Sequence, residues 1–277
     1  MSDNTPWANK RLGQHFLNDP QVISAICSDF INLAELMVEV GPGAGALTSQ
    51  LAEQRLPLLL VEKDIRFKER LTSLVSSEQI IFADALSLSL GDAFAERRLD
   101  SSHVWLISNL PYNISVPLTM SFIQTPQIRY MTLMFQREVG EKIVIPASVP
   151  GQRKRGQGMN SLAALLQNYF ECRLLCHVPP SSFSPPPKVD SIVISCQRRD
   201  APRIGWEQFK SYESFLRQMF AMKRKQLHKV LRSHYLPEQL DPVFERCGID
   251  PKVRAETFNL DQVQLLYEGL ILRENGE

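Results

Sequence analysis

Asn109, Leu110, Pro111 and Tyr112 place an amide, a rigid ring and an aromatic side chain directly after the apolar run at 104–108. Pro111 fixes its own φ and biases Leu110 toward an extended backbone, so the carbonyls and side chains around it point in fixed directions. Such a segment can hold a ligand. Asn and Pro are also ordinary turn residues, and a plain strand-to-helix connection is the alternative.

A glycine-rich segment, EVGPGAGALT at 39–48, follows another apolar run and begins an expected helix. Its glycines let the backbone turn tightly and approach a ligand, beside the exposed amides of a helix N-terminus. The spacing is G-x-G-x-G with Ala46 at the last position, which differs from the G-x-G-x-x-G fingerprint of NAD sites. NAD is therefore disfavoured, and a Walker A loop is excluded because no G-K-[ST] follows.

Two acidic residues end the next expected strands. Glu62 can accept hydrogen bonds from both hydroxyls of a ribose, and Asp84 can accept one from an adenine amine. Together with the turn at Gly41, and with no phosphate-binding lysine, they describe a nucleoside ligand without phosphates. S-adenosylmethionine is the common cofactor of that type. A coincidental set of strand-end acids in an unrelated α/β protein is the alternative.

Short apolar or β-branched runs alternate with amphipathic stretches over the first 200 residues, which predicts a mostly parallel α/β sheet with helices on both faces. The last two runs are separated only by PPSSFSPPPKVD, which is too rich in proline to contain a helix. We therefore expect them to form one antiparallel strand pair at an edge of a Rossmann-like methyltransferase sheet. The runs lie at 36–40, 57–62, 80–84, 104–108, 130–135, 174–178 and 191–196.

After residue 200 the pattern changes to helices only. Apolar residues recur at three-and-four spacing through 206–235, and two shorter helical segments follow. The expected organisation is a catalytic domain at 1–200, which binds the cofactor, and a smaller all-α domain at 201–277, which docks on RNA.

The composition is that of a globular protein, with 44% hydrophobic and 22% charged residues among 277. No apolar run reaches the roughly 20 residues of a membrane helix, and the N-terminus has no presequence pattern, so we expect a cytoplasmic protein without membrane contact. The five cysteines form no C-x-x-C pair, which argues against a disulfide framework or a metal site.

Positive charge is concentrated in one segment although the net charge is only +1. Residues 198–232 hold ten Lys and Arg against three acids, which suits a polyanion such as RNA; a solvated helix face is the alternative. A second basic cluster lies in the loop at 149–158. The candidate RNA-binding residues are Lys223, Arg224, Lys225, Lys229 and Arg232, with Arg153, Lys154 and Arg155 in the loop.

With EVGPGAGALT, LVEKD, FADAL and SNLPYNIS in this order, the chain resembles the ribosomal RNA adenine dimethyltransferase family. The resemblance extends through KRLGQHFLND, MFQREVGEKI, VPPSSFSPPPKVDS, FAMKRKQLHKVL and GIDPKVRAETFNLDQ, and so covers nearly the whole chain. It is strongest to the bacterial small-subunit (16S) enzymes, which dimethylate two adjacent adenosines in a hairpin near the 3′ end of that RNA. The resemblance implies S-adenosylmethionine as cofactor, small-subunit RNA as partner, no metal and a monomer.

The resemblance also implies roles for individual residues. Asn109 stands beside the transferring methyl group, and Tyr112 and Phe183 hold the target base between them. For Phe183, a hydrophobic plug in its loop is the alternative, and without the family motif the favoured one. Residues of the cofactor site are His15 and Leu17 in an N-terminal segment over the cofactor, Gly41 at the turn, Glu62 on the ribose, Asp84 on the adenine and Asn109 beside the methyl group. The sequence departs from the family pattern at Ala83, Gln157 and His228, where Gly, an aromatic residue and Asn are common.

An exocyclic adenine amine is a poor nucleophile because its lone pair is delocalised into the ring. The Asn109 amide oxygen and the Leu110 carbonyl can accept its two hydrogens and stabilise the positive charge that develops on attack, with Pro111 fixing their direction. No strong base is required, which agrees with an amide at position 109.

Three other functions remain open. A non-catalytic RNA-binding assembly or transcription factor on the same fold is disfavoured by the intact Glu62, Asp84, Asn109 and Tyr112. A large-subunit RNA adenine methylase is disfavoured by the full proline motif. A DNA adenine methyltransferase is disfavoured by that motif and by the basic helical C-terminal region.

Overall fold

The computed structural model describes residues 6, 8–9, 12–99, 101–144, 158–222 and 225–272. The chain divides into two compact units, the first made of 1–140 and 172–198 and the second of 141–171 and 199–277. The first unit contains the sheet. The second groups 141–171 with the C-terminal helices, whereas the sequence pattern assigns this segment to the catalytic domain.

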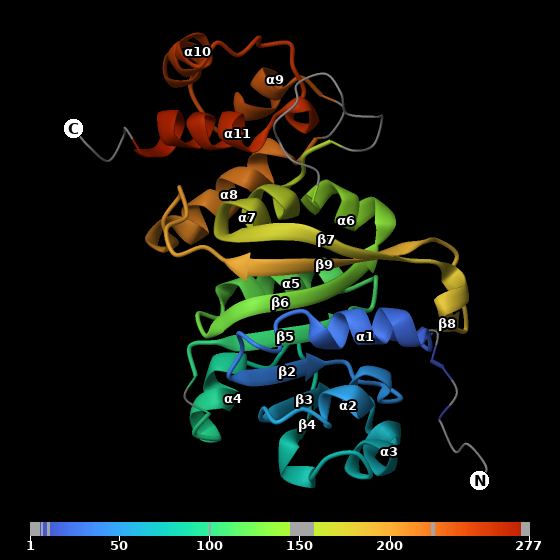
Figure 1. The fold of residues 1–277 in the computed structure, drawn as a ribbon. Coiled ribbons are helices and arrows are strands. Elements are labelled where there is room, and N and C mark those ends of the chain that lie inside the picture. The colour runs from blue at the N-terminus through green and yellow to red at the C-terminus, as the bar shows by residue number, and fades with distance from the viewer. Residues whose placement is uncertain are drawn as a thin grey trace. The chain divides into compact units, whose positions relative to one another are not determined.

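The main sheet has seven strands among the described residues, in the order β4-β3-β2-β5-β6-β9-β7 (Figure 1). The pairs among β2, β3, β4, β5 and β6 are parallel, which confirms the predicted α/β sheet. The strands are β2 (Leu36–Val40), β3 (Leu58–Glu62), β4 (Ile80–Phe82), β5 (Val104–Asn109), β6 (Ile128–Gln136), β7 (Phe170–Val178) and β9 (Ser191–Arg198).

The strands β7 and β9 are neighbours at one edge of the sheet, as predicted, and β7 is the outermost strand. Strand β9 pairs antiparallel with β6 and lies between β6 and β7. Burial explains the order, because β9 is buried at nearly every position while much of β7 is exposed. A strand that is apolar on both faces gains more from an interior place, and the more polar strand tolerates the edge.

A second, two-stranded sheet joins distant parts of the chain. Strand β1 (Phe16–Leu17) pairs antiparallel with β8 (Phe183–Ser184), so Leu17 lies opposite Phe183. The N-terminal segment is thereby attached to the proline-rich segment that precedes β9.

The helices of the first unit cover both faces of its sheet, with α1 in front of the strands and α5 behind β6 in the view of Figure 1. No helix in the described part of the chain is long and apolar enough to cross a membrane. The helices are α1 (Pro20–Ser28), α2 (Ala46–Leu51), α3 (Lys68–Thr72), α4 (Leu90–Glu96) and α5 (Ser115–Gln124), with 3₁₀ turns at Ile65–Phe67, Ser77–Gln79 and Pro180–Ser182. The helix α6 (Arg137–Val144) begins in the first unit and ends in the second.

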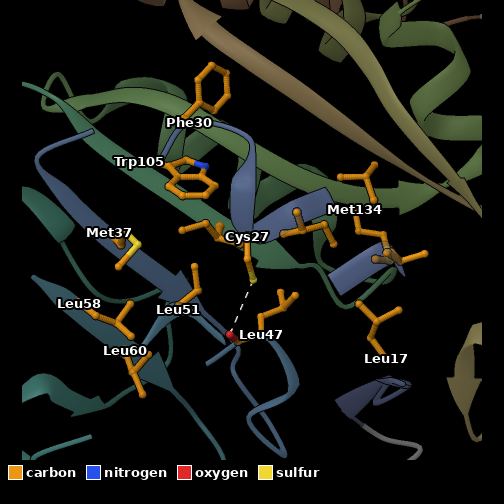
Figure 2. Packing of buried hydrophobic residues seen from close by; sticks show 14 of the residues in the cluster. Leu17, Cys27, Phe30, Met37, Leu47, Leu51, Leu58, Leu60, Trp105 and Met134 are labelled. Atoms are coloured by element: carbon orange, nitrogen blue, oxygen red, sulfur yellow. Dashed lines mark hydrogen bonds between the residues drawn. The ribbon is translucent and has the colours of Figure 1, made fainter. Parts of the chain in front are cut away.

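Alternate residues of the strands point into one hydrophobic cluster beneath α1 and α2. Figure 2 shows Met37, Leu58, Leu60 and Trp105 from the strands facing Cys27 of α1. The Cys27 thiol lies 3.8 Å from the Leu47 carbonyl oxygen, and burial raises its pKa to about 12. Because helices cover the sheet on both faces, the apolar runs of the strands are nearly continuous.

The second unit is helical, and a buried amide ties its elements together. Asn168 donates to the Ile204 carbonyl at 3.0 Å and accepts from the Ile204 amide at 3.1 Å and from Gln264 at 2.8 Å. Its helices are α7 (Ser161–Tyr169), α8 (Phe209–Met219), α9 (Leu227–Leu231), α10 (Pro237–Arg246) and α11 (Leu260–Tyr267), with 3₁₀ turns at Trp206–Gln208 and Ala255–Thr257 and a π-helical turn at Glu268–Leu272.

A buried arginine closes the first unit at the end of β9. Arg198 donates to the carbonyl oxygens of Ile123, Thr125 and Ile128 at 2.7–2.9 Å, where α5 ends and β6 begins. Burial lowers its pKa to about 10, so it remains charged at neutral pH. The guanidinium thus supplies hydrogen-bond donors where α5 ends and β6 begins, and the Thr125 carbonyl also accepts from the Ile128 amide at 3.2 Å.

Replacing Arg198 by Met should lower the free energy of unfolding by about 2–4 kcal/mol, because it removes three buried hydrogen bonds to backbone carbonyls. Urea unfolding followed by circular dichroism measures the change. The neighbouring exposed residue Arg199, changed to Met, serves as the matched control and should change stability by less than about 0.5 kcal/mol. Equal stability of both variants would contradict the role assigned to Arg198.

Candidate active site

A cavity of about 220 Å³ opens in the first unit at the carboxyl ends of β2, β3, β4 and β5. In a parallel sheet these ends lie along one edge, where ligands of such folds bind. The structure brings nine of the predicted residues to its wall. They are His15, Leu17, Gly41, Glu62, Asp84, Asn109, Leu110, Pro111 and Tyr112.

The glycine turn after β2 depends on backbone angles that side chains rarely adopt. Gly41, Gly43 and Gly45 have φ values of 75°, 53° and 82°. The ring of Phe16, in the N-terminal segment, packs beside Gly43. Glycine at this turn therefore allows the chain reversal.

Glu62 is buried and holds the glycine turn against the end of β3. Its carboxylate accepts from the Gly43 amide at 2.9 Å and from the Asp64 amide at 2.7 Å, through different oxygens. Burial raises the pKa of Glu62, opposed by these two amides and by that of Lys63. A carboxylate has about four lone-pair sites, so Glu62 can also accept from a ribose hydroxyl.

Asp84 is more exposed than Glu62 and is held by Lys63. The Lys63 ammonium lies 2.6 Å from its carboxylate, and the Leu86 amide donates to it at 3.0 Å. The hydrogen bond from Lys63, followed by that from the Leu86 amide, lowers the pKa of Asp84. Asp84 therefore remains an ionised acceptor at the cavity wall.

Asp64 attaches the N-terminal segment to the wall beside Glu62. Its carboxylate accepts from Gln14 at 3.0 Å and from Arg66 at 2.5–3.2 Å, and Arg66 chiefly lowers its pKa to about 2. The Gln14 amide oxygen accepts from the Asn9 backbone amide at 2.8 Å. Sequence reasoning missed Gln14 and Asp64, although both stand inside the motifs GQHFL and EKD.

Glu39 is a further carboxyl group at the cavity wall, and the sequence motifs assign it no role. It is buried, and its carboxyl group accepts from the Thr48 hydroxyl at 2.7 Å. Burial raises the pKa of Glu39 to about 8; the Thr48 bond opposes this and the charge of Glu62 adds to it. The group therefore carries a proton over much of the neutral range.

The side-chain amide of Asn109 has a defined orientation at the end of β5. Its Nδ2 donates to the backbone carbonyl of His15 at 3.1 Å, while the described residues give its Oδ1 no hydrogen-bond partner. The His15 ring in turn donates from Nδ1 to the Pro185 carbonyl at 2.8 Å. Asn109 thus presents an unused acceptor at the cavity wall.

Tyr112 is half-buried, and its ring is in contact with two other segments. Its hydroxyl lies 2.7 Å from the Ser191 hydroxyl, and its ring stacks on that of His15 with 5.8 Å between centroids and 24° between planes. Burial raises the pKa of Tyr112, so the phenol stays neutral.

The structure does not bring Phe183 to the cavity wall beside Tyr112. Its side chain is 3% exposed and packs in the hydrophobic cluster with Leu17 and Val178. The ring that lies beside Tyr112 is that of His15.

Lys225, Lys229 and Arg232 are exposed at and beside α9 in the second unit. His228 is hydrogen-bonded through Nε2 to the Asp241 carboxylate at 2.6 Å. The other predicted RNA-binding residues, Arg153, Lys154, Arg155, Lys223 and Arg224, lie outside the described residues, as does Gln157.

No three His, Cys, Asp or Glu side chains of the described ranges gather in a way that could hold a metal ion. The hydrogen-bonding groups of the cavity are instead side-chain carboxylates and amides together with backbone carbonyls and amides of the turns. Such groups fit the hydroxyls and amines of a nucleoside.

The model of the ribosomal RNA adenine dimethylase family matches residues 7–271. The chain is 34% identical over 260 residues to a ribosomal RNA small subunit methyltransferase A of Clostridium botulinum, which covers 92% of this chain and 90% of that protein. The protein of that name in Synechococcus elongatus is 33% identical over 265 residues, 92% of each chain.

Two solved structures share the fold. A dimethyladenosine transferase from Plasmodium falciparum superposes with a TM-score of 0.70 at 21% identity, over 95% of this chain and 98% of that one. The 23S rRNA methyltransferase ErmE superposes with a TM-score of 0.67 at 22% identity, over 92% and 99%. Such low identities establish the fold and leave the substrate open.

Glu39→Gln should change the pH dependence of stability. The folded protein keeps a proton on Glu39 up to about pH 8, whereas the unfolded chain releases it near the ordinary pKa of 4.5. Wild-type stability should therefore fall between those values, by up to about 1.4 kcal/mol per pH unit more than that of the variant, in which Gln still accepts from Thr48. Urea unfolding at a series of pH values measures this slope.

The exposed Glu53, changed to Gln, is the matched control and should keep the wild-type slope. Parallel stability curves for wild type and Glu39→Gln would contradict a protonated Glu39.

Proposed function

The chain belongs to the ribosomal RNA adenine dimethylase family, whose members transfer methyl groups from S-adenosylmethionine, and we propose that its own substrate is small-subunit ribosomal RNA. It converts two adjacent adenosines of a hairpin near the 3′ end of that RNA into N6,N6-dimethyladenosines during ribosome biogenesis. The observation that carries the choice of subunit is the similarity to small-subunit methyltransferases over 92% of the chain. A ribosomal substrate agrees with the predicted cytoplasmic location.

S-adenosylmethionine fits the hydrogen-bond acceptors of the cavity. It supplies an electrophilic methyl group on a sulfonium, which leaves as a neutral thioether. Glu62 would accept from its ribose, and Asp84 from its adenine amine. The turn at Gly41 would let the backbone approach it, with the segment at His15 and Leu17 on its other side.

The target amine is held by two neutral acceptors. Because Asn109 Nδ2 donates a hydrogen bond to the His15 carbonyl, the Oδ1 atom of Asn109 is the one that accepts a hydrogen of the target amine. The Leu110 backbone carbonyl accepts the other, in a direction that Pro111 fixes. Both acceptors stabilise the positive charge that develops on the nitrogen.

A general base is not needed in this arrangement, because the proton can leave to water after methyl transfer. The monomethylated amine keeps one hydrogen and can donate it to one of the same acceptors. A second transfer in the same site is therefore chemically feasible.

The target base must leave its stack to reach Asn109, and an aromatic face replaces the stacking that it gives up. We assign that face to Tyr112. Phe183 would contact the base only after leaving the cluster with Leu17 and Val178, so the proposal rests on Tyr112.

The exposed basic residues at and beside α9 would contact the phosphate backbone. Lys229 and Arg232 are three positions apart and therefore lie on one side of α9 and its C-cap. Lys225 and the basic residues outside the described ranges extend this set. Such contacts fix position and contribute little to sequence choice.

The function itself is tested by nucleoside analysis of RNA from unmodified small subunits incubated with the full chain and S-adenosylmethionine. Dimethyladenosine in small-subunit RNA is the expected product. Product only in large-subunit RNA or duplex DNA would refute the proposal in favour of those substrates. Absence of product together with absence of cofactor binding would favour a non-catalytic RNA-binding factor.

Asn109→Ala should lower kcat by about 100- to 1,000-fold, because it removes an acceptor that acts on the developing charge. The cofactor Kd, measured by calorimetry, should stay within about twofold of wild type. Retained turnover in this variant would contradict the role of Asn109.

Glu62→Gln provides the contrasting control. It replaces one carboxylate oxygen by a donor facing backbone amides and ribose hydroxyls, so the cofactor Kd should rise by about tenfold or more. With saturating cofactor, kcat should recover to within about threefold of wild type.

Lys229→Ala and Arg232→Ala should each weaken RNA binding. Each should also reduce the slope of log affinity against log salt by about one, because each substitution removes one cation from the phosphate backbone. Filter binding to the small-subunit hairpin at several salt concentrations measures this slope. Lys252, an exposed lysine outside α9, is the matched control, and Lys252→Ala should leave the slope unchanged. Wild-type slopes in all three variants would refute an RNA contact at α9.

A further inference from the structure

The Ser191 hydroxyl belongs to no element of the predicted site, yet it contacts the candidate reaction centre. Ser191 is the first residue of β9, directly after the proline-rich segment, and is 0% exposed. Its hydroxyl lies 2.7 Å from that of Tyr112, although the two residues are 79 positions apart.

The sheet order explains how the two residues meet. Tyr112 follows β5, and Ser191 begins β9; both strands pair with β6, where Ser191 lies opposite Gln136 at the strand end. The Tyr112 side chain therefore reaches across the end of β6. The Ser115 hydroxyl also donates to the Tyr112 carbonyl at 3.1 Å, which holds the backbone of the loop.

We propose that Ser191 is a positioning residue for methyl transfer, which fixes the ring plane of Tyr112 through the paired hydroxyls so that the ring can stack on the target adenine. This inference rests on the proposed function. Ser191 contacts neither base nor cofactor in it and acts only through Tyr112. The described residues give the Ser191 hydroxyl no other side-chain partner, and Tyr112 is thereby held at its hydroxyl as well as by the His15 ring.

The physical reason is that stacking depends on the orientation of the two ring planes. A tyrosine ring without its hydroxyl anchor can rotate about its side-chain bonds, and the base then spends less time in line with the methyl donor. Loss of alignment of that kind lowers turnover without changing how the cofactor is held.

The test uses the full chain with S-adenosylmethionine and unmodified small subunits, and compares wild type, Ser191→Ala, Tyr112→Phe and the double variant. Each single change removes the same hydroxyl pair from one side, and the ring itself remains in Tyr112→Phe. Both should lower kcat by about tenfold, with the cofactor Kd within about twofold of wild type. The double variant should be no slower than the slower single variant, because either single change already breaks the shared hydrogen bond.

The same strand offers a matched control. Ser195 is also buried on β9 and lies on the same face as Ser191, but its hydroxyl has no hydrogen-bond partner among the residues that the structure describes. Ser195→Ala should keep wild-type kcat and Kd. A similar loss in Ser195→Ala and Ser191→Ala would overturn the proposal, because it would indicate a general effect of smaller side chains in β9.

The remaining outcomes separate this proposal from the one it rests on. An active wild type with full kcat in Ser191→Ala and Tyr112→Phe overturns the positioning role alone. Losses that multiply in the double variant overturn it as well, because they show independent effects. A wild type that leaves small subunits unmodified while binding the cofactor overturns the proposed substrate and the positioning role together.

Discussion

Helices cover both faces of the central sheet, so its strands are apolar over most of their length, and polar side chains of the site stand where strands end. Glu62 ends β3 and Asn109 ends β5, and Asp84 follows β4. Because these strands run parallel, their carboxyl ends lie along one edge of the sheet. The same constraint explains why buried polar groups inside the strands find partners, as Glu39 does with Thr48 and Trp105 with Thr132.

The cavity wall is completed by a segment that the sheet does not contain. The N-terminal residues are attached at Asp64 through Gln14, at Asn109 through the His15 carbonyl, and at β8 through β1. One short segment thus contacts the proposed cofactor side and the proposed amine side. Its position depends on hydrogen bonds to both.

Charge is distributed unevenly around the cavity. The acidic residues Glu62 and Asp84 lie on the wall assigned to the cofactor, and burial or ion pairing sets their pKa values in opposite directions. The proposed reaction centre at Asn109, Leu110 and Tyr112 carries neutral acceptors and a neutral phenol. Neutral acceptors can stabilise a developing cation without taking a proton from the amine.

Local patterns in the sequence determined the strands, the glycine turn and the acids at strand ends, because apolar periodicity and turn chemistry act over a few residues. The motif order also identified the family. Only the tertiary structure decided that β9 lies inside the sheet, that Phe183 is buried in the core, and that Ser191 meets Tyr112. These features depend on contacts between residues far apart in the chain, and burial on both faces of β9, rather than its spacing from β7, selected the arrangement.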